Sequence, residues 1–242
     1  MAATERLWCI VPAAGSGRRF GSDIPKQYLP LAGKPLLEWT LERLAACAEV
    51  RGLMVVLADG DGWWPGITEV VGKPVRTATG AAERSGSVLS GLRALPADVA
   101  PDEFVLVHDA ARPCISPDDV TMLVVRGIPA GGALLATPLR DTLKRSGAER
   151  RVVGTESRDA LWRALTPQLF RRGELTRALE VARAGHIAVT DEAMAMELQR
   201  HRPLLVEGAE DNIKVTTPAD LALAALLLAG GTGNRASGMD GK

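Results

Sequence analysis

Apolar runs of strand length recur along the chain and alternate with segments of helical spacing. The runs cover residues 7–12, 52–57, 104–108 and 131–137. Between the first two, "PLLEWTLERLAACAEV" puts its leucines on one helical face, and "SVLSGLRAL" at 87–95 has a similar pattern. Strands that are apolar throughout and alternate with amphipathic helices predict an α/β fold, with a mostly parallel sheet covered by helices on both faces.

Three segments depart from this alternation. Residues 139–160 are polar and charge-rich, with a Ser-Gly turn, and predict a hairpin that projects from the body. A plain solvated surface hairpin is the alternative. The apolar stretch "LALAALLLAG" at 221–230 predicts a buried helix, and the Gly-rich residues 231–242 predict a disordered tail. We therefore expect a single domain over residues 1–230.

Composition restricts the possible partners. Lys plus Arg and Asp plus Glu both total 29, so the formal net charge is zero, and neither nucleic acid nor a membrane surface is an expected partner. Cys9, Cys47 and Cys114 are scattered and have no metal-binding spacing, which favours a reducing cytoplasm. The first residues do not resemble a targeting segment, and the longest apolar stretch is about half of what a bilayer requires.

The loop after the first strand predicts a phosphate-binding site. Ligands of such sheets bind beyond the carboxyl ends of the strands, which places this loop near "DAARP" at 109–113 and "TPLRDT" at 137–142. Gly15 and Gly17 allow close approach to a phosphate, while Arg19 and Lys26 offer charge. Neither a dinucleotide fingerprint nor a Walker motif is complete here. An ordinary turn with surface arginines is the alternative.

A longer set of motifs resembles one enzyme family, the 2-C-methyl-D-erythritol 4-phosphate cytidylyltransferases of the non-mevalonate isoprenoid pathway. The matching segments span about residues 7–228 in the family's order. They are "PAAGSGRRFGSDIPKQYLPLAGKPLLEWT" at 12–40, "ERSGSVLSGL" at 83–92, "VHDAARP" at 107–113, "RDT" at 140–142, "LWRALTPQLF" at 161–170, "TDEAMAMEL" at 190–198 and "EGAEDNIKVTTPADLALA" at 207–224. The resemblance implies a Rossmann-like nucleotidyltransferase fold and transfer of CMP from CTP to methylerythritol phosphate, with release of pyrophosphate.

The resemblance also implies roles for individual residues. The expected catalytic cations are Arg19, Lys26, Arg158 and Lys214. The expected substrate contacts are Asp109, Arg112, Thr142, Thr166 and Thr190. The expected nucleotide contacts are Pro12, Ala13, Ala14, Gly15, Gly17, Gly80, Ala82, Ser87 and Ala110. Magnesium is the expected cofactor, held mainly by the phosphates, with Asp109 as the candidate protein ligand; a helix N-cap is the alternative for Asp109.

The family further implies a homodimer in which the 139–160 hairpin is an arm, so that Arg158 and Thr166 complete the partner's site. One loop departs from the pattern: the family usually has two adjacent glycines before its Glu-Arg pair, and this chain reads Gly80, Ala81, Ala82, which puts the cytosine contacts in question. We expect His108 to be a packed strand-end residue, and Trp63 and Trp64 to anchor a loop rather than stack on a base. A ribitol 5-phosphate cytidylyltransferase and a catalytically idle nucleotide-binding protein remain the alternatives.

Overall fold

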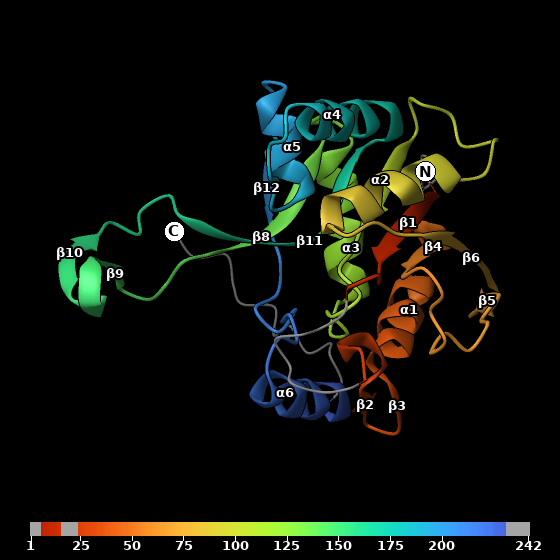
Figure 1. Ribbon diagram of the computed structural model, residues 1–242, viewed down its shortest axis with the longest axis horizontal. Helices are drawn as coiled ribbons and strands as arrows, with labels where there is room; N and C mark the ends of the chain where they lie inside the picture. The colour runs from red at the N-terminus through yellow and green to blue at the C-terminus, as the bar shows by residue number, and fades with distance from the viewer. Residues whose placement is uncertain (1–5, 16–23, 231–242) are drawn as a thin grey trace, which may run out of the picture.

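The computed structural model describes residues 6–15 and 24–230, and the predicted tail at 231–242 lies outside this part of the chain. Eight of the described strands form one sheet (Figure 1). In their order across the sheet they are β12 (Leu204–Glu207), β8 (Ala133–Pro138), β11 (Trp162–Arg171), β7 (Phe104–Val107), β1 (Leu7–Pro12), β4 (Val50–Leu57), β6 (Lys73–Thr79) and β5 (Glu69–Val70). The four strands expected from apolar runs are all present.

The sheet is mostly parallel, as predicted. Strand β1 pairs in parallel with β4 and β7, β4 with β6, and β12 with β8. Strand β11 is the main exception, because it lies antiparallel between β7 and β8. The carboxyl ends of β1 and β7 therefore lie at the same edge of the sheet. Strand β11, beside β7, runs in the opposite direction.

Helices cover both faces of the sheet because successive side chains of a strand point to opposite sides. In β1, Cys9 and Val11 face α1 (Leu36–Ala46) and α3 (Pro117–Gly127). Trp8 and Ile10 face the other layer, which is formed by α2 (Arg84–Ala94), α4 (Arg172–Ala184) and α5 (Glu192–Leu198). A fully apolar strand is thus stabilised by two separate core layers.

The predicted hairpin is present as a projecting arm. Strands β9 (Leu143–Ser146) and β10 (Val152–Glu156) pair antiparallel, with the short helix η3 (Ala148–Arg150) at the turn. Figure 1 shows this arm extending far from the body, joined to it by the chain that leaves β8 and returns as β11. Its side chains pair with one another, as Arg145 does with Glu156 at 2.6 Å, and Val152 and Val153 are exposed.

The prediction that residues 221–230 form a buried helix is wrong in one respect. Helix α6 (Pro218–Ala229) packs beside the small hairpin of β2 (Pro30–Leu31) and β3 (Lys34–Pro35), but only Ala224 and Leu228 are buried. Leu226 is 71% exposed, because α6 lies on the outside of the body and is covered from one side. No helix within residues 6–15 and 24–230 has the length and apolarity needed to cross a membrane.

Candidate active site

A cavity of about 350 Å³ opens beyond the carboxyl ends of β1 and β7. Five segments of the sequence line it: the end of β1 with the residues that follow, residues 26–27, the start of α2 with the loop before it, the loop after β7, and the loop after β12. The cavity brings together many of the predicted site residues, namely Pro12, Ala13, Ala14, Gly15, Lys26, Ala82, Ser87, Asp109, Ala110 and Lys214. Gly17 and Arg19 lie outside the described residues.

One side of the cavity is built from backbone held in place by two polar side chains. Gln27, in the short helix η2 (Lys26–Tyr28), donates from Nε2 to the carbonyl oxygen of Ala13 at 2.6 Å. Ser87 Oγ accepts from the N–H of Ala81 at 3.0 Å. Gly80 packs so closely under Ala14 that a Cβ there would lie 2.5 Å from the Ala14 methyl carbon. This wall therefore has a fixed shape that presents main-chain groups to a ligand.

The alanines that replace the family's glycines fit this wall without backbone strain. Neither Ala81 nor Ala82 has a positive φ, so the fold does not require glycine at either position. Both residues line the cavity. The departure from the family pattern therefore leaves the main-chain path of this loop intact and adds two methyl groups beside the cavity.

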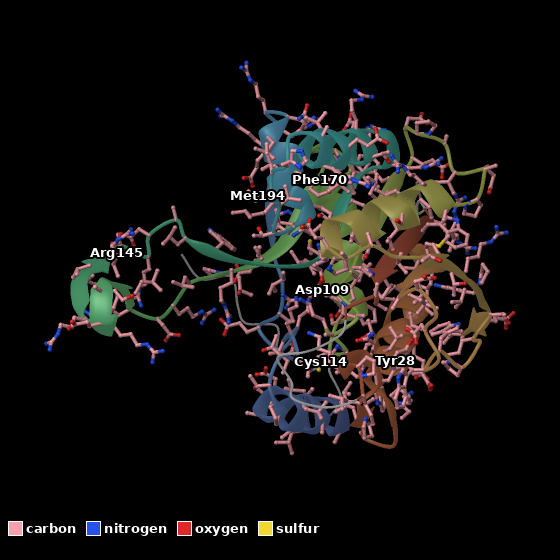
Figure 2. All side chains as sticks on the ribbon, viewed as in Figure 1. Tyr28, Asp109, Cys114, Arg145, Phe170 and Met194 are labelled. Atoms are coloured by element: carbon pink, nitrogen blue, oxygen red, sulfur yellow. The ribbon has the colours of Figure 1, made fainter. Side chains whose placement is uncertain are left out.

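Asp109, labelled in Figure 2, lines the cavity and is surrounded by three cationic side chains. Its Oδ1 accepts from Arg84 Nε at 2.9 Å, and its Oδ2 lies 2.9 Å from Lys214 Nζ and 3.4 Å from Arg112 Nε. Burial alone would raise the pKa of this carboxyl, but the three cations outweigh that effect and hold the pKa well below its usual range. Asp109 is therefore ionised at neutral pH and orders the cations around it. It does not cap α3, whose N-cap is Ser116.

Lys26 and Lys214 approach the cavity from opposite ends of the sequence. Lys26 Nζ donates to the carbonyl oxygen of Val215 at 3.1 Å, and the N–H of Val215 donates to the Ala111 carbonyl oxygen at 2.8 Å. Asn212, two residues before Lys214, donates to the Thr166 carbonyl oxygen at 2.7 Å. These contacts fix the loop after β12 against the loop after β7, so both ammonium groups are held at one site.

Arg112 is placed behind this site rather than in it. Its Nη1 donates to the carbonyl oxygen of Asn212 at 2.7 Å, and the side chain is almost fully buried. Arg112 is not among the residues that line the cavity. In this structure it supports the loop that carries Lys214.

His108 is a packed strand-end residue, as expected. Its Nδ1 lies 3.0 Å from Thr166 Oγ1, which in turn accepts from the N–H of Asp109 at 3.0 Å. Its Nε2 lies 3.0 Å from the carbonyl oxygen of Arg112, which assigns the ring proton to Nε2. Burial lowers the pKa of His108 to about 4. The ring is therefore neutral and supports Asp109 through the Thr166 hydroxyl. Thr166 itself is buried in the body of its own chain and does not lie on the arm.

Of the predicted residues that the structure describes, Gly80, Arg112 and Thr166 lie just behind the cavity wall, and Thr142, Arg158 and Thr190 do not line the cavity either. Thr142 and Arg158 lie on the exposed arm, where Arg158 donates to the carbonyl oxygen of Arg140. Thr190 is exposed just before α5, with its hydroxyl 3.6 Å from Met194 Sδ. Figure 2 shows Arg145, on the same arm, far from Asp109. Within its own chain, neither Arg158 nor Thr142 contributes to the cavity.

The tryptophan pair lies away from the cavity. Trp63 stacks on Tyr28 with ring centroids 6.4 Å apart, and the Tyr28 hydroxyl donates to Asp61 Oδ2 at 2.8 Å. Trp64 packs against the main core. Both residues anchor the loop between β4 and β5, which confirms the expected role.

Arg84 and Glu192 are among the residues in and behind the site that were not assigned from the sequence. Arg84 lines the cavity, and its Nη1 and Nη2 donate to Glu192 Oε1 at 2.6 Å and Oε2 at 3.1 Å. Glu192 is completely buried at the start of α5. The signal was a carboxylate at the head of the apolar segment "EAMAMEL", where a buried acid needs a cation. Its partner, 108 residues away, could not be identified from spacing.

The side chains around the cavity offer few ligands for a magnesium ion. Within residues 6–15 and 24–230, no group of three or more His, Cys, Asp and Glu side chains is arranged to hold a metal. The ionised carboxylate of Asp109 is nevertheless at the cavity wall. Such a site fits magnesium held mainly by the phosphates of a bound nucleotide, with Asp109 as the facing protein carboxylate.

A cationic cavity with a backbone wall, at the carboxyl ends of a mostly parallel sheet covered on both faces, defines a nucleotide-binding α/β protein. Its likeness to known proteins is more specific. Residues 7–230 match the family model of 2-C-methyl-D-erythritol 4-phosphate cytidylyltransferase, IspD. The chain belongs to this family, whose members are nucleotidyltransferases.

Relatives and solved structures agree with this assignment. The chain is 59% identical over 221 residues to the 2-C-methyl-D-erythritol 4-phosphate cytidylyltransferase of Xanthomonas euvesicatoria pv. vesicatoria, covering 90% of this chain and 83% of the relative. The protein of the same name from Stenotrophomonas maltophilia is 59% identical over 216 residues, covering 89% and 93%. The crystal structure of the Francisella tularensis protein of that name is similar with a TM-score of 0.78 at 32% identity, covering 92% of this chain and all of the other.

Proposed function

We propose that this protein transfers CMP from CTP to 2-C-methyl-D-erythritol 4-phosphate and releases pyrophosphate. The observation that carries the proposal is the cavity in which Lys26, Lys214 and ionised Asp109 meet beside a wall of main-chain groups. Two anionic substrates need concentrated positive charge to approach each other, and the whole chain has no net charge to supply it. The family assignment specifies which anions these are.

In the proposed reaction, a phosphate oxygen of methylerythritol phosphate attacks the α-phosphorus of CTP. The new P–O bond forms as the bond to the bridging oxygen of the β-phosphate breaks, and that oxygen leaves with both electrons as part of pyrophosphate. The attacking phosphate is already ionised at neutral pH, so the reaction needs no general base. This agrees with the neutral, buried ring of His108.

The chain's residues would act mainly through position and charge. Lys26 and Lys214 would stabilise the charge that develops on the equatorial and leaving oxygens, because fixed cations in a partly closed site need no reorganisation. Asp109 would hold the Lys214 ammonium in place and contact the substrate hydroxyls. The wall formed by Ala13, Ala14, Gly80 to Ala82 and Ser87 would contact the cytosine, and Arg19 keeps its predicted role on the triphosphate.

Magnesium belongs to the proposal as the cofactor. When bound, it would neutralise part of the triphosphate charge. Asp109 would be the protein carboxylate that faces it.

The arm suggests a homodimer with shared sites. The arm projects from the body (Figure 1) and presents exposed Val152 and Val153, and neither Thr142 nor Arg158 at its base lines the cavity. In the proposed dimer, Arg158 and Thr142 contact the substrate phosphate in the partner's site, whereas Thr166 acts within its own chain. A cytoplasmic location is proposed as well, supported by three buried free thiols.

The test is a pyrophosphate-release assay with purified protein and magnesium. CTP with methylerythritol phosphate should give turnover, and UTP or ATP should give much less. Turnover with ribitol 5-phosphate but not with methylerythritol phosphate would refute the substrate assignment. Equal rates with CTP, UTP and ATP would refute the proposed cytosine contacts.

A further inference from the structure

Glu192 is a buried carboxylate that the proposed reaction does not use. It is the first residue of α5, it is 0% exposed, and it does not line the cavity. Both of its oxygens accept from Arg84, at 2.6 and 3.1 Å, in the parallel two-bond geometry that fixes a guanidinium group most firmly. A buried acid held this way determines the orientation of the arginine.

Arg84 connects this acid to the reacting site. Two of its nitrogens are engaged by Glu192, and its Nε donates to Asp109 Oδ1 at 2.9 Å. A planar guanidinium group that is fixed at two nitrogens has its third nitrogen fixed in direction as well. With Oδ1 held by Arg84, the Oδ2 atom of Asp109 is the one that faces Lys214, at 2.9 Å.

The segment that carries Glu192 is itself anchored to the sheet. Gln168, in β11, accepts from the N–H of Ala193 at 2.8 Å through Oε1 and donates to Asp191 Oδ2 at 3.0 Å through Nε2. Asp191 also caps α5 by accepting from the N–H of Met194 at 2.9 Å. The start of α5 is therefore held on both sides, and Glu192 is a rigid support.

We propose that Glu192 is a positioning residue for CMP transfer: through Arg84 it fixes the orientation of Asp109, and through Asp109 it places the Lys214 ammonium group at the reacting phosphates. This inference rests on the proposed function. It also extends the site, because it links the nucleotide wall at the start of α2 to the segment that follows Thr190, a predicted substrate contact.

The first test is Glu192→Gln, which keeps the size of the side chain and removes its charge. Because the side chain does not line the cavity, the Michaelis constants for CTP and methylerythritol phosphate should change less than about threefold. The kcat should fall by roughly tenfold or more, because a small displacement of a charge at the reacting centre costs that much. Circular dichroism and thermal unfolding show at which temperatures the variant is folded, and the assay is run at such a temperature.

A control variant is offered by a second ion pair of α2, the helix that begins at Arg84. Arg93 of α2 pairs with Glu180 of α4 at 2.7 Å, also between two helices but exposed and away from the cavity. Glu180→Gln removes the same charge from the same kind of pair. Its kcat should equal that of the wild type.

A second variant tests the route through Arg84 and does not depend on the folding of the first. Arg84→Lys keeps the positive charge but cannot bond two carboxylates in a planar geometry, so its kcat should fall to a similar extent. In the Arg84→Lys background, Glu192→Gln should lower the kcat by less than about twofold further, because the route is already broken. Unchanged kcat in either single variant, or fully multiplicative losses in the double variant, would overturn the inference while leaving the proposed function standing. An inactive wild type would overturn both.

Discussion

Replacing Gly80 by alanine should move the wall that contacts the nucleotide. A Cβ at this position would lie 2.5 Å from the Ala14 Cβ, 2.9 Å from Ser87 Oγ and 3.1 Å from the Leu57 carbonyl oxygen. Two of these atoms belong to residues that line the cavity. The third accepts the N–H of Gly80 itself at 2.7 Å, so the chain cannot retreat without losing a main-chain hydrogen bond.

The size of the effect follows from these distances. Carbon atoms in contact prefer about 3.5 to 4 Å, so Ala14 and residue 80 have to separate by roughly 1 Å. Forced displacements of this kind in a packed site cost about 1 to 3 kcal/mol. If the displacement acts on the nucleotide wall, kcat/KM for CTP should fall by roughly tenfold to a hundredfold.

The assay is pyrophosphate release at varied CTP, with UTP as the competing nucleotide. The Michaelis constant for CTP should rise and the preference for CTP over UTP should fall, because the shifted wall no longer fits the base. Gly62→Ala is the control, since a Cβ there meets no atom within 4 Å. Wild-type kcat/KM and base preference in the Gly80→Ala protein would refute the reasoning that this wall is rigid and contacts the nucleotide.

Three further predictions follow from the site. Lys26→Ala and Lys214→Ala should each lower turnover by about a hundredfold with an unchanged circular dichroism spectrum, and near-normal rates would remove that lysine from the mechanism. Burial lowers the pKa of His108 from 6.5 to about 4. Between pH 6.5 and pH 4 the unfolded state therefore binds more protons than the folded state. The free energy of unfolding should be highest above about pH 6.5 and should fall by roughly 3 kcal/mol toward pH 4. Urea unfolding at several pH values should show a smaller loss in the His108→Gln protein, and an equal pH dependence in both proteins would contradict the prediction. Mixing inactive Lys26→Ala and Arg158→Ala proteins with random subunit exchange should restore about a quarter of wild-type activity if the arm completes the partner's site, whereas continued inactivity after exchange shown by native mass spectrometry would exclude sharing.

The strands of the central sheet could be predicted where both of their faces are buried. Strands β1, β4, β7 and β8 are apolar at nearly every position because helices cover them on two sides. The sequence of strand β11 does not show the pattern of a strand, because its first residues are exposed and only its second half is buried. Its insertion between β7 and β8 depends on pairing with residues far away in sequence, which no local pattern carries.

The apolar helix at the C-terminal end illustrates the opposite limit. Helix α6 is so uniformly apolar that the pattern predicts burial on all sides, yet Leu223 and Leu226 are exposed. Hydrophobicity predicts that a helix needs cover, but how much of its circumference is covered depends on where the helix docks. That position is decided by the small cluster around Leu31 and Val215, which forms only in the folded chain.

Residues of the site could be predicted where a motif named them, and not where their role depends on a distant partner. Lys26, Asp109 and Lys214 were expected together and do meet at one cavity. Arg84 and Glu192 stand inside two of the quoted motifs, but their pairing joins helices from different parts of the chain. A buried acid that needs a cation can be recognised from the sequence, whereas the identity of that cation is a property of the tertiary structure.

The place of β11 in the sheet has a consequence for synthesis on the ribosome. The chain completes β1, β4, β6, β7 and β8 before it reaches Trp162, so for that interval both β7 and β8 lack the strand that later separates them. Unpaired strand flanks in a growing polypeptide invite pairing with other chains. This vulnerable interval ends when residues 162–171 emerge from the exit tunnel. The arm is made just before them, so the segment that projects farthest from the body is translated while the sheet is still open.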